Sequence, residues 1–475
     1  MKFLRKNKDS RQSRLGQLLE LIREALRGDE HNYTEGPIRK AVALLAIPMV
    51  LEMSLESLFA IVDIFFVAGL GSYAVAVVGL TEAVITLIYA VAIGFSMAVT
   101  ALIARRIGEA NPDQAALTAT QVLIISAFLS AVIGAIGLFF AGDILRLMGA
   151  EPDVLAKGES YTRLMLGGCV TIIFLFVLAA VFRGAGNAII AMRAMWLANG
   201  INIVLDPCLI YGWGPFPELG VTGAAVATNI GRGIGGLYLL YHLFSYDSAV
   251  KIVRKHLRFS AEVTFGLLKV SVGGIAQFFI ATASWVFLMR IVAQFGSEAV
   301  AGYTIAIRVV MFTFLPAWGL SNAAATLVGQ CLGANKPERA EQSVWKTAKY
   351  NVSFMVAVAV VLLVFAPGLI AFFNDEATVI NVGTLTLRIV ALGYGFFGLG
   401  MVLTQAFNGA GDTVTPTWIN FIGFWLTQIP LALLAANILG WQTFVVAFAV
   451  CFAESLIALI AWWQFAKGKW KLKEV

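Results

Sequence analysis

The sequence has few of the residues that usually carry catalysis or bind metal ions. Its 475 residues include only 3 histidines and 4 cysteines, and charged residues make up 13%. The cysteines lie singly in apolar stretches, without the spacing of a metal site or a disulfide, so we interpret them as small hydrophobic residues. The histidines lie outside the apolar stretches or at their ends. No catalytic triad or metal-ligand set is present, so the sequence predicts neither an enzyme nor a metalloprotein.

Nucleotide-binding motifs are also missing. Two glycine-rich segments, 183–186 and 408–411, each join two apolar stretches, with no strand before them and no Lys-Ser or Lys-Thr pair after them. A phosphate-binding loop needs both features, so we predict tight connections between helices instead. Without a nucleotide site, any active transport by this chain would have to use an ion gradient.

Hydrophobic residues, in contrast, are abundant. They make up 59% of the chain, and the mean hydropathy is +0.84, which excludes a soluble protein of this size. Twelve apolar stretches reach about 20 residues or more, the length that a bilayer requires of a helix. They lie near 40–67, 76–104, 117–141, 160–182, 188–213, 220–245, 263–294, 299–331, 346–373, 381–407, 414–438 and 440–466. The predicted fold class is an all-α integral membrane protein with twelve transmembrane helices.

The basic residues are unevenly distributed between the loops. Lysine and arginine total 34 against 28 acidic residues, and they cluster before 41, at 251–258, at 336–346 and after 466. The alternate loops contain none, near 68–75, 214–219, 366–380 and 438–441. By the positive-inside rule we expect both termini to face the cytoplasm, which requires an even number of spans and agrees with twelve. The expected location is the plasma membrane. Because these charges already determine topology, we do not expect nucleic-acid binding.

The same distribution divides the chain into five parts. Residues 1–36 are hydrophilic and basic, without the apolar core of a signal peptide. Leucine and isoleucine recur there at helical spacing, which predicts an amphipathic helix on the cytoplasmic membrane surface; a disordered or partner-binding tail is the alternative. The other parts are an N-lobe at 37–246, a cytoplasmic linker at 247–261, a C-lobe at 262–466 and a basic cytoplasmic tail at 467–475.

The two lobes repeat one another at an offset of 225 residues. The glycines at 71, 94 and 108 recur at 296, 319 and 333, and segment 183–186 aligns with 408–411. Each half contains six predicted helices, and repeats with an even number of spans enter the membrane in the same orientation. We therefore predict two parallel six-helix repeats around a substrate path, related by an axis along the membrane normal.

Ionisable residues inside the apolar stretches are the first functional candidates, because each is costly in a bilayer. In the first helix the spacing of Glu52, Glu56 and Asp63 places them on one face. This stripe is expected to face the interior between the lobes, with Glu52 and Glu56 in the substrate cavity; an interfacial position of Glu52 is the alternative. Arg308, in the eighth helix, is a further cavity candidate that could instead pair with a carboxylate or cap a helix end. Pro48 either permits two bends of the first helix or fixes a static kink.

The fifth helix contains a second buried acid. Asn202 and Asp206 lie four residues apart and share a face, while Pro207 frees a backbone carbonyl nearby. Together with a hydroxyl, these groups would form a hard-oxygen site, which suits H⁺ or Na⁺ and does not suit a transition metal. No cofactor is expected beyond the coupling ion.

Over residues 36–466 the chain resembles the multidrug and toxic compound extrusion (MATE) transporters. The motifs that carry the resemblance are Ile47-Pro48-Met49 with Asp63 downstream, Ile103–Gly108, Arg183–Gly186, Asn202–Pro207 and Gly220–Ala225. The resemblance implies two six-helix lobes around a V-shaped central cavity. It also implies export of cationic, amphipathic small molecules in exchange for H⁺ or Na⁺.

Within that family the chain is most similar to the DinF-like branch, which implies an ion site in the N-lobe. The matching residues are Asp63, Asn202, Asp206, Thr228 and Tyr161, and Na⁺ is a candidate ion at the first four.

The C-lobe lacks corresponding acids. Ile280 occupies the position of a glutamate that is important in the classic Na⁺-coupled branch, and at the repeat offset Asp63 and Asp206 become Leu288 and Leu431. We therefore expect the N-lobe to be the coupling half.

A lipid-linked oligosaccharide flippase of related fold is the alternative function. Such a protein is expected to line its cavity with more cations, to hold pyrophosphate, than this sequence offers. The expected partners are small-molecule substrates and the lipid bilayer, and the chain is expected to act as a monomer.

Overall fold

The computed structural model describes residues 14–28, 31–245, 249–437 and 444–473, and every regular element in these ranges is a helix. This confirms the predicted all-α class. Residues 1–13 and 474–475 of the predicted terminal segments, 247–248 of the predicted linker and the predicted loop near 438–441 lie outside the described residues.

The helices form two lobes in chain order. The N-lobe contains α2 (Ile38–Ala68), α3 (Ser72–Gly108), α4 (Pro112–Leu147), α5 (Pro152–Gly167), α6 (Cys169–Ala185), α7 (Ala188–Tyr211) and α8 (Val221–Phe244). The C-lobe contains α9 (Ala261–Ala293), α10 (Ser297–Gly333), α11 (Pro337–Ala371), α12 (Ala377–Leu392), α13 (Tyr394–Gly409), α14 (Val414–Asn420), the π-helical η2 (Phe421–Gln428), α15 (Ile429–Asn437) and α16 (Phe444–Ala466). Outside the lobes lie α1 (Arg14–Arg27), η1 (Arg254–His256) and η3 (Lys469–Leu472).

Each lobe provides six spans once the broken helices are joined. Gly168 separates α5 from α6 and Gly393 separates α12 from α13, so both repeats break their fourth span at the same position of the repeat. By length and hydropathy, ten helical segments of the described residues could cross a membrane, and the α12–α13 pair, bent by 56°, makes eleven. The remaining predicted span is α8, whose hydropathy is lowered by five glycines together with Thr228, Asn229 and Arg232. The twelve predicted spans thus fit the structure.

The lobes are in close contact at one end of the molecule. A Cβ atom on Gly108 would lie 2.1 Å from the carbonyl oxygen of Gln330, and one on Gly333 would lie 2.2 Å from that of Arg105. Farther along α3, a Cβ on Gly94 would lie 2.3 Å from the backbone nitrogen of Ile275 in α9. Backbones approach this closely only where glycine removes the side chain. We call this region the closed end.

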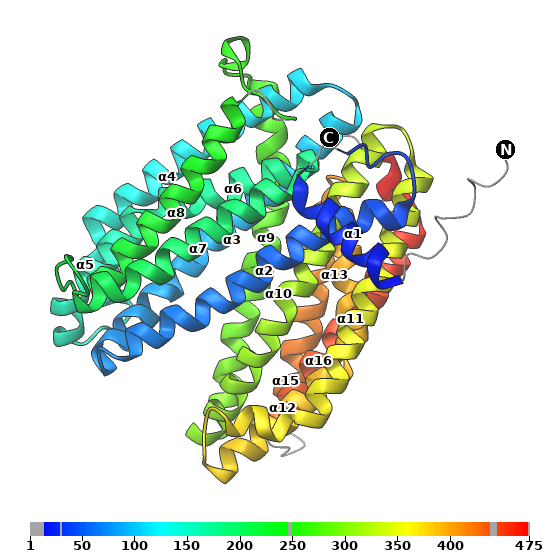
Figure 1. The fold of residues 1–475 in the computed structure, drawn as a ribbon. Helices are drawn as coiled ribbons and strands as arrows, with labels where there is room; N and C mark the ends of the chain where they lie inside the picture. The colour runs from blue at the N-terminus through cyan, green and yellow to red at the C-terminus, as the bar shows by residue number, and fades with distance from the viewer. Residues whose placement is uncertain (1–13, 29–30, 246–248, 438–443, 474–475) are drawn as a thin grey trace, which may run out of the picture.

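At the other end the repeats do not meet. Gly71 and Gly296, in the corresponding loops, have nothing within 4 Å of a Cβ position. Figure 1 shows the lobes adjacent near α1 and diverging toward α5 and α12. The predicted V-shaped bundle is therefore present, and its opening lies opposite α1 and η3.

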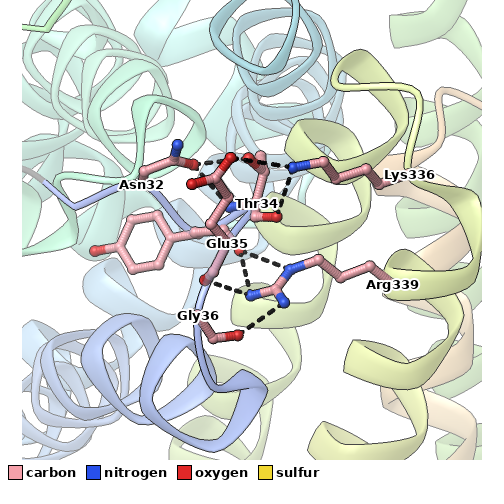
Figure 2. Close-up of polar contacts among 7 residues, drawn as sticks. Asn32, Thr34, Glu35, Gly36, Lys336 and Arg339 are labelled. Carbon is pink, nitrogen blue, oxygen red and sulfur yellow. Dashed lines mark hydrogen bonds and ion pairs between the residues drawn. The ribbon is translucent and has the colours of Figure 1, made fainter.

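The residues just before α2 bind both lobes at the closed end. We call residues 31–36 the strap. The Tyr33 hydroxyl donates to the carbonyl oxygen of Gly186 at 3.0 Å, and burial raises the pKa of this hydroxyl, so it stays a donor. From the C-lobe, the Arg339 guanidinium donates to the carbonyl oxygens of Tyr33, Glu35 and Gly36 at 2.7–3.1 Å (Figure 2).

Lys336 adds to this contact, since its Nζ donates to the Thr34 carbonyl oxygen at 3.1 Å (Figure 2). The C-terminal residues bind in a similar way. Arg105 of the N-lobe donates to the carbonyl oxygen of Lys473 at 3.0 Å, while the Lys473 ammonium lies 3.3 Å from Asp412 of the C-lobe. Both terminal segments therefore link the lobes at the closed end.

The predicted helix near the N-terminus is present as α1. It packs against α2 and α7, and Leu21 and Ala25 contribute to a small hydrophobic cluster with Tyr33 and residues of α2. Leu19 is exposed. The helix itself is confirmed, and part of its apolar face is covered by the protein; a position on the membrane surface stays a prediction.

Arg339→Gln is expected to release the strap from the C-lobe. The substitution removes charged hydrogen bonds to three carbonyl groups, each worth about 1.5–3 kcal/mol when the donor is ionised. Hydrogen–deuterium exchange should therefore become faster across residues 31–41, and Arg290→Gln, at an exposed position, should leave it unchanged. Equal exchange in wild type and Arg339→Gln would show that the strap is held by its other contacts.

Candidate functional site

The centre of the N-lobe contains a cluster of buried polar side chains on α7 and α8. Asn202, Asp206 and Thr228 are all nearly inaccessible to solvent. In the orientation that satisfies both ends of its amide, Asn202 donates to Asp206 Oδ2 at 2.9 Å and accepts from Thr228 Oγ1 at 3.0 Å. Pro207 lacks the N–H that would pair with the Ile203 carbonyl, so this turn also provides a backbone oxygen. The predicted hard-oxygen cluster is thus assembled by two helices.

Asp63 and Tyr161 join this cluster from α2 and α5. Asp63 lies close enough to Asp206 for the two carboxylates to repel each other, and its charge also acts on the buried Tyr161. The helix α2 is held against α7 by side chains along its length. Asn199 donates to Glu56 at 2.9 Å, and the Tyr211 hydroxyl donates to the Phe66 carbonyl oxygen at 2.5 Å. Hydrogen bonds therefore join three of the five residues predicted for the ion site, and Asp63 and Tyr161 interact with this cluster electrostatically.

Arg232 is a part of this site that the sequence analysis missed. It lies one turn after Thr228 on the same face of α8, and it is 8% exposed. Its guanidinium interacts with the charges of Asp63 and Glu56 and lies 5.6 Å from the centroid of the Tyr89 ring. One guanidinium nitrogen, Nη1, has no hydrogen-bond partner among the described residues. The four-residue spacing from Thr228 was the signal that could have identified it.

The stripe of carboxylates on α2 is divided between different partners. Glu52 is fully buried and forms an ion pair of 2.6 Å with Arg183 of α6, in the segment predicted to connect two helices. Gly186, with φ of 89°, ends α6 there, which confirms that connection. Because Glu52 is neutralised by a buried arginine, it is not available as a free cavity carboxylate. Glu56, one turn farther along, does line the cavity.

A central cavity lies between the lobes and has two adjoining parts, of about 200 and 300 Å³. Met97, Leu315, Trp318 and Gln405 line both parts. Together the two parts reach the size of pockets that hold drug-sized ligands. The lining is mostly apolar and aromatic, and its charged residues are Glu56, Arg183 and Glu454. Such a lining favours amphipathic molecules over strongly hydrated ones.

Two other candidates have different positions. Arg308 is exposed on α10, lines neither part of the cavity and interacts electrostatically with Glu82 of the N-lobe. No ion pair of Arg308 is present within the described residues, so its pairing with a carboxylate stays a prediction. Pro48 lies within α2, which continues through it as one helix.

Comparisons with known proteins match this architecture. The MatE family model matches residues 48–208 and 275–434, one match in each repeat. A protein of Thermotoga maritima named probable multidrug resistance protein NorM is 29% identical over 446 residues, covering 92% of this chain and 94% of that protein. An FAD transporter of Shewanella oneidensis is 26% identical, covering 89% and 93%.

A solved structure is similarly close. It is described as the outward-facing conformation of a multidrug resistance MATE family transporter of the MOP superfamily, and it matches with a TM-score of 0.87 at 27% identity. The match covers 94% of this chain and 100% of that one. The similarity therefore extends over both lobes rather than one repeat.

Proposed function

Because this chain belongs to the MATE family, a family of multi-pass membrane transporters, we propose that it is a secondary active exporter of cationic, amphipathic small molecules in exchange for H⁺ or Na⁺. The observation that carries the coupling is the pair of N-lobe carboxylates, Asp63 and Asp206, with the amide and hydroxyl of Asn202 and Thr228 beside them. The observation that carries the substrate class is an apolar cavity whose charged lining has more acids than bases.

The proposed cycle starts from the cost of two negative charges in a small, poorly solvated space. One H⁺ or Na⁺ held between Asp63 and Asp206 removes the repulsion between them and part of the desolvation cost. Loss or gain of that charge changes how α2 packs in the N-lobe, where Arg232 competes for Asp63. The ion must bind the two states with different affinity, since only a differential affinity can shift their populations.

In this cycle the ion enters from the open side and lowers the affinity of the cavity for a cation. The substrate then leaves to the same side, and the lobes move so that the closed end opens. We place the closed end on the cytoplasmic side, because the basic terminal segments lie there. The structure would then be the outward-facing state of a plasma-membrane exporter.

The test is efflux of a fluorescent cationic dye from proteoliposomes under an imposed pH gradient and, separately, an imposed Na⁺ gradient. Efflux driven by one gradient and not by the other would identify the coupling ion. Efflux under neither gradient would contradict secondary active transport of cations.

The alternative, a flippase for lipid-linked oligosaccharides, needs cavity cations to hold pyrophosphate. The one cation that lines the described cavity is Arg183, and it is already paired with Glu52. A flippase would move a lipid-linked oligosaccharide across the vesicle membrane without an ion gradient. That result in the same liposomes would favour the alternative.

A further inference from the structure

Glu454 is an acidic residue of the C-lobe that is not part of the N-lobe coupling site. It lies on α16, at the C-lobe part of the central cavity, and its side chain lines that part. Within the described residues no hydrogen bond or ion pair involves Glu454, in contrast to Glu52 and Glu56 in the N-lobe. A carboxylate in an apolar setting without a partner is costly unless a cation or a proton neutralises it.

The walls around Glu454 are suited to an organic cation. Trp285, Trp318, Phe278 and Phe314 line the same part of the cavity. Aromatic faces attract a cation through the ring quadrupole, and the attraction is stronger where water is excluded. Apolar rings also bury the hydrophobic groups of an amphipathic molecule, which a small hydrated ion does not have.

Gln277 and Gln405, two amides that line this part, are less available as ligands for a metal ion. Gln277 donates to Asn408 at 3.0 Å, Asn408 donates to Gln405 at 3.2 Å, and Gln405 donates to Asn322 at 3.0 Å. This chain of hydrogen bonds engages these amides with one another. Among the residues that line this part, Glu454 is the charged group that remains for a ligand, and Asn420 is a further amide beside it.

The local backbone is irregular beside Glu454. The π-helical segment η2 packs against α16, and its Phe424 lines the same part of the cavity, next to Asn420. Trp425 of η2 donates to the Ile280 carbonyl oxygen at 3.0 Å, which holds η2 against α9. Single π-helical turns inside α-helices are frequent at functional sites. The corresponding part of the N-lobe, in α7, is regular and contains Asn202.

From this geometry we propose that the C-lobe part of the cavity is a substrate subsite in which Glu454 is the counter-ion of the transported cation and the surrounding aromatic side chains bind its apolar groups. The subsite is separate from the coupling site of Asp63 and Asp206, so the two lobes have different binding roles. The N-lobe binds the coupling ion and the C-lobe recognises the positive charge of the substrate. This inference rests on the proposed export of cations.

The test uses tetraphenylphosphonium, a permanent cation with four aromatic rings, and the purified full chain in detergent. Glu454→Gln is expected to weaken tetraphenylphosphonium binding about tenfold or more, because the charge is lost while the shape is kept. Glu454→Asp should retain part of the affinity. Glu298→Gln, at an exposed position of the same lobe, should bind as wild type does. Binding of the uncharged dye Nile red should change little in any of these variants.

A second variant keeps the test decisive if Glu454→Gln does not fold. Trp285 lines only the C-lobe part, so Trp285→Leu should also weaken tetraphenylphosphonium binding. Phe176 lines the N-lobe part, so Phe176→Leu should have a smaller effect. If wild type exports the cation and both Glu454→Gln and Trp285→Leu bind it as tightly, this inference is wrong and the proposed function stands. If wild type neither binds nor exports any cation, the proposed function is wrong, and the inference of a cation subsite is wrong with it.

Discussion

Asp63→Asn is expected to reduce gradient-driven efflux to the level of liposomes without protein. The substitution keeps the size of the side chain but removes one of the two carboxylate charges that would hold the ion between Asp63 and Asp206. The site then no longer binds H⁺ or Na⁺ with different affinity in the two states. Without that difference the gradient cannot shift the populations of the states. Efflux of a cationic dye under the imposed gradient measures the effect directly.

Several controls separate lost coupling from lost folding. Asp375→Asn makes the same chemical change at an exposed position and should transport as wild type does. Asp63→Asn itself should insert normally and elute as wild type in gel filtration, since an amide is easier to bury than a carboxylate. Normal pumping by a correctly inserted Asp63→Asn would refute the assignment of this residue. Asp206→Asn should give the same loss for the same reason.

Gly108→Ala is expected to destabilise the closed end and so to prevent the state described above. A Cβ atom there would lie 2.1 Å from the Gln330 carbonyl oxygen, and neither backbone can move without separating α3 from α10. Overpacking of this kind costs about 1–3 kcal/mol. That free energy corresponds to a change of about five- to 150-fold in the ratio of two states. Efflux should fall in proportion, because alternating access needs both states.

The same helix provides a matched control. Gly79 also lies in α3, and a Cβ at that position would meet nothing within 4 Å. Gly79→Ala should therefore preserve efflux and add helix stability, by about 1 kcal/mol at most. The distance between spin labels at Pro112 and Glu338, one exposed position on each lobe, should increase in Gly108→Ala and stay unchanged in Gly79→Ala. An unchanged distance in both variants would show that the closed end tolerates the extra methyl group.

The charged residues of α2 show which properties could be predicted from the sequence and which could not. Helical spacing correctly placed Glu52, Glu56 and Asp63 on one face, because the angle between residues of a helix is a local property. Their partners are not local. Glu52 pairs with Arg183 and Glu56 accepts from Asn199, residues more than 130 positions away that helical periodicity cannot connect. The stripe therefore appeared uniform in the sequence and is divided in the structure.

The basic clusters near the closed end give a second example. Lys336, Arg339 and the C-terminal lysines were interpreted as signals of membrane topology. In the structure Arg339 and Lys336 also bind the strap, and Lys473 binds Asp412. The positive-inside rule uses only the number of charges in a loop, so it gives no information about what each charge contacts.

The sequence by itself determined the features that depend on local composition and period. These are the all-α membrane class, the twelve spans, the parallel repeat and the buried acids of the candidate ion site; Thr228 and Tyr161 were added by the resemblance to a family. Only the tertiary structure decided which charges are neutralised, where the lobes touch, that Arg232 interacts with the charge of Asp63, and that Glu454 lines the central cavity. The physical reason is that burial and pairing depend on contacts between distant helices, such as the backbone approach at Gly108 and Gln330, and these contacts exist only after the lobes have packed together.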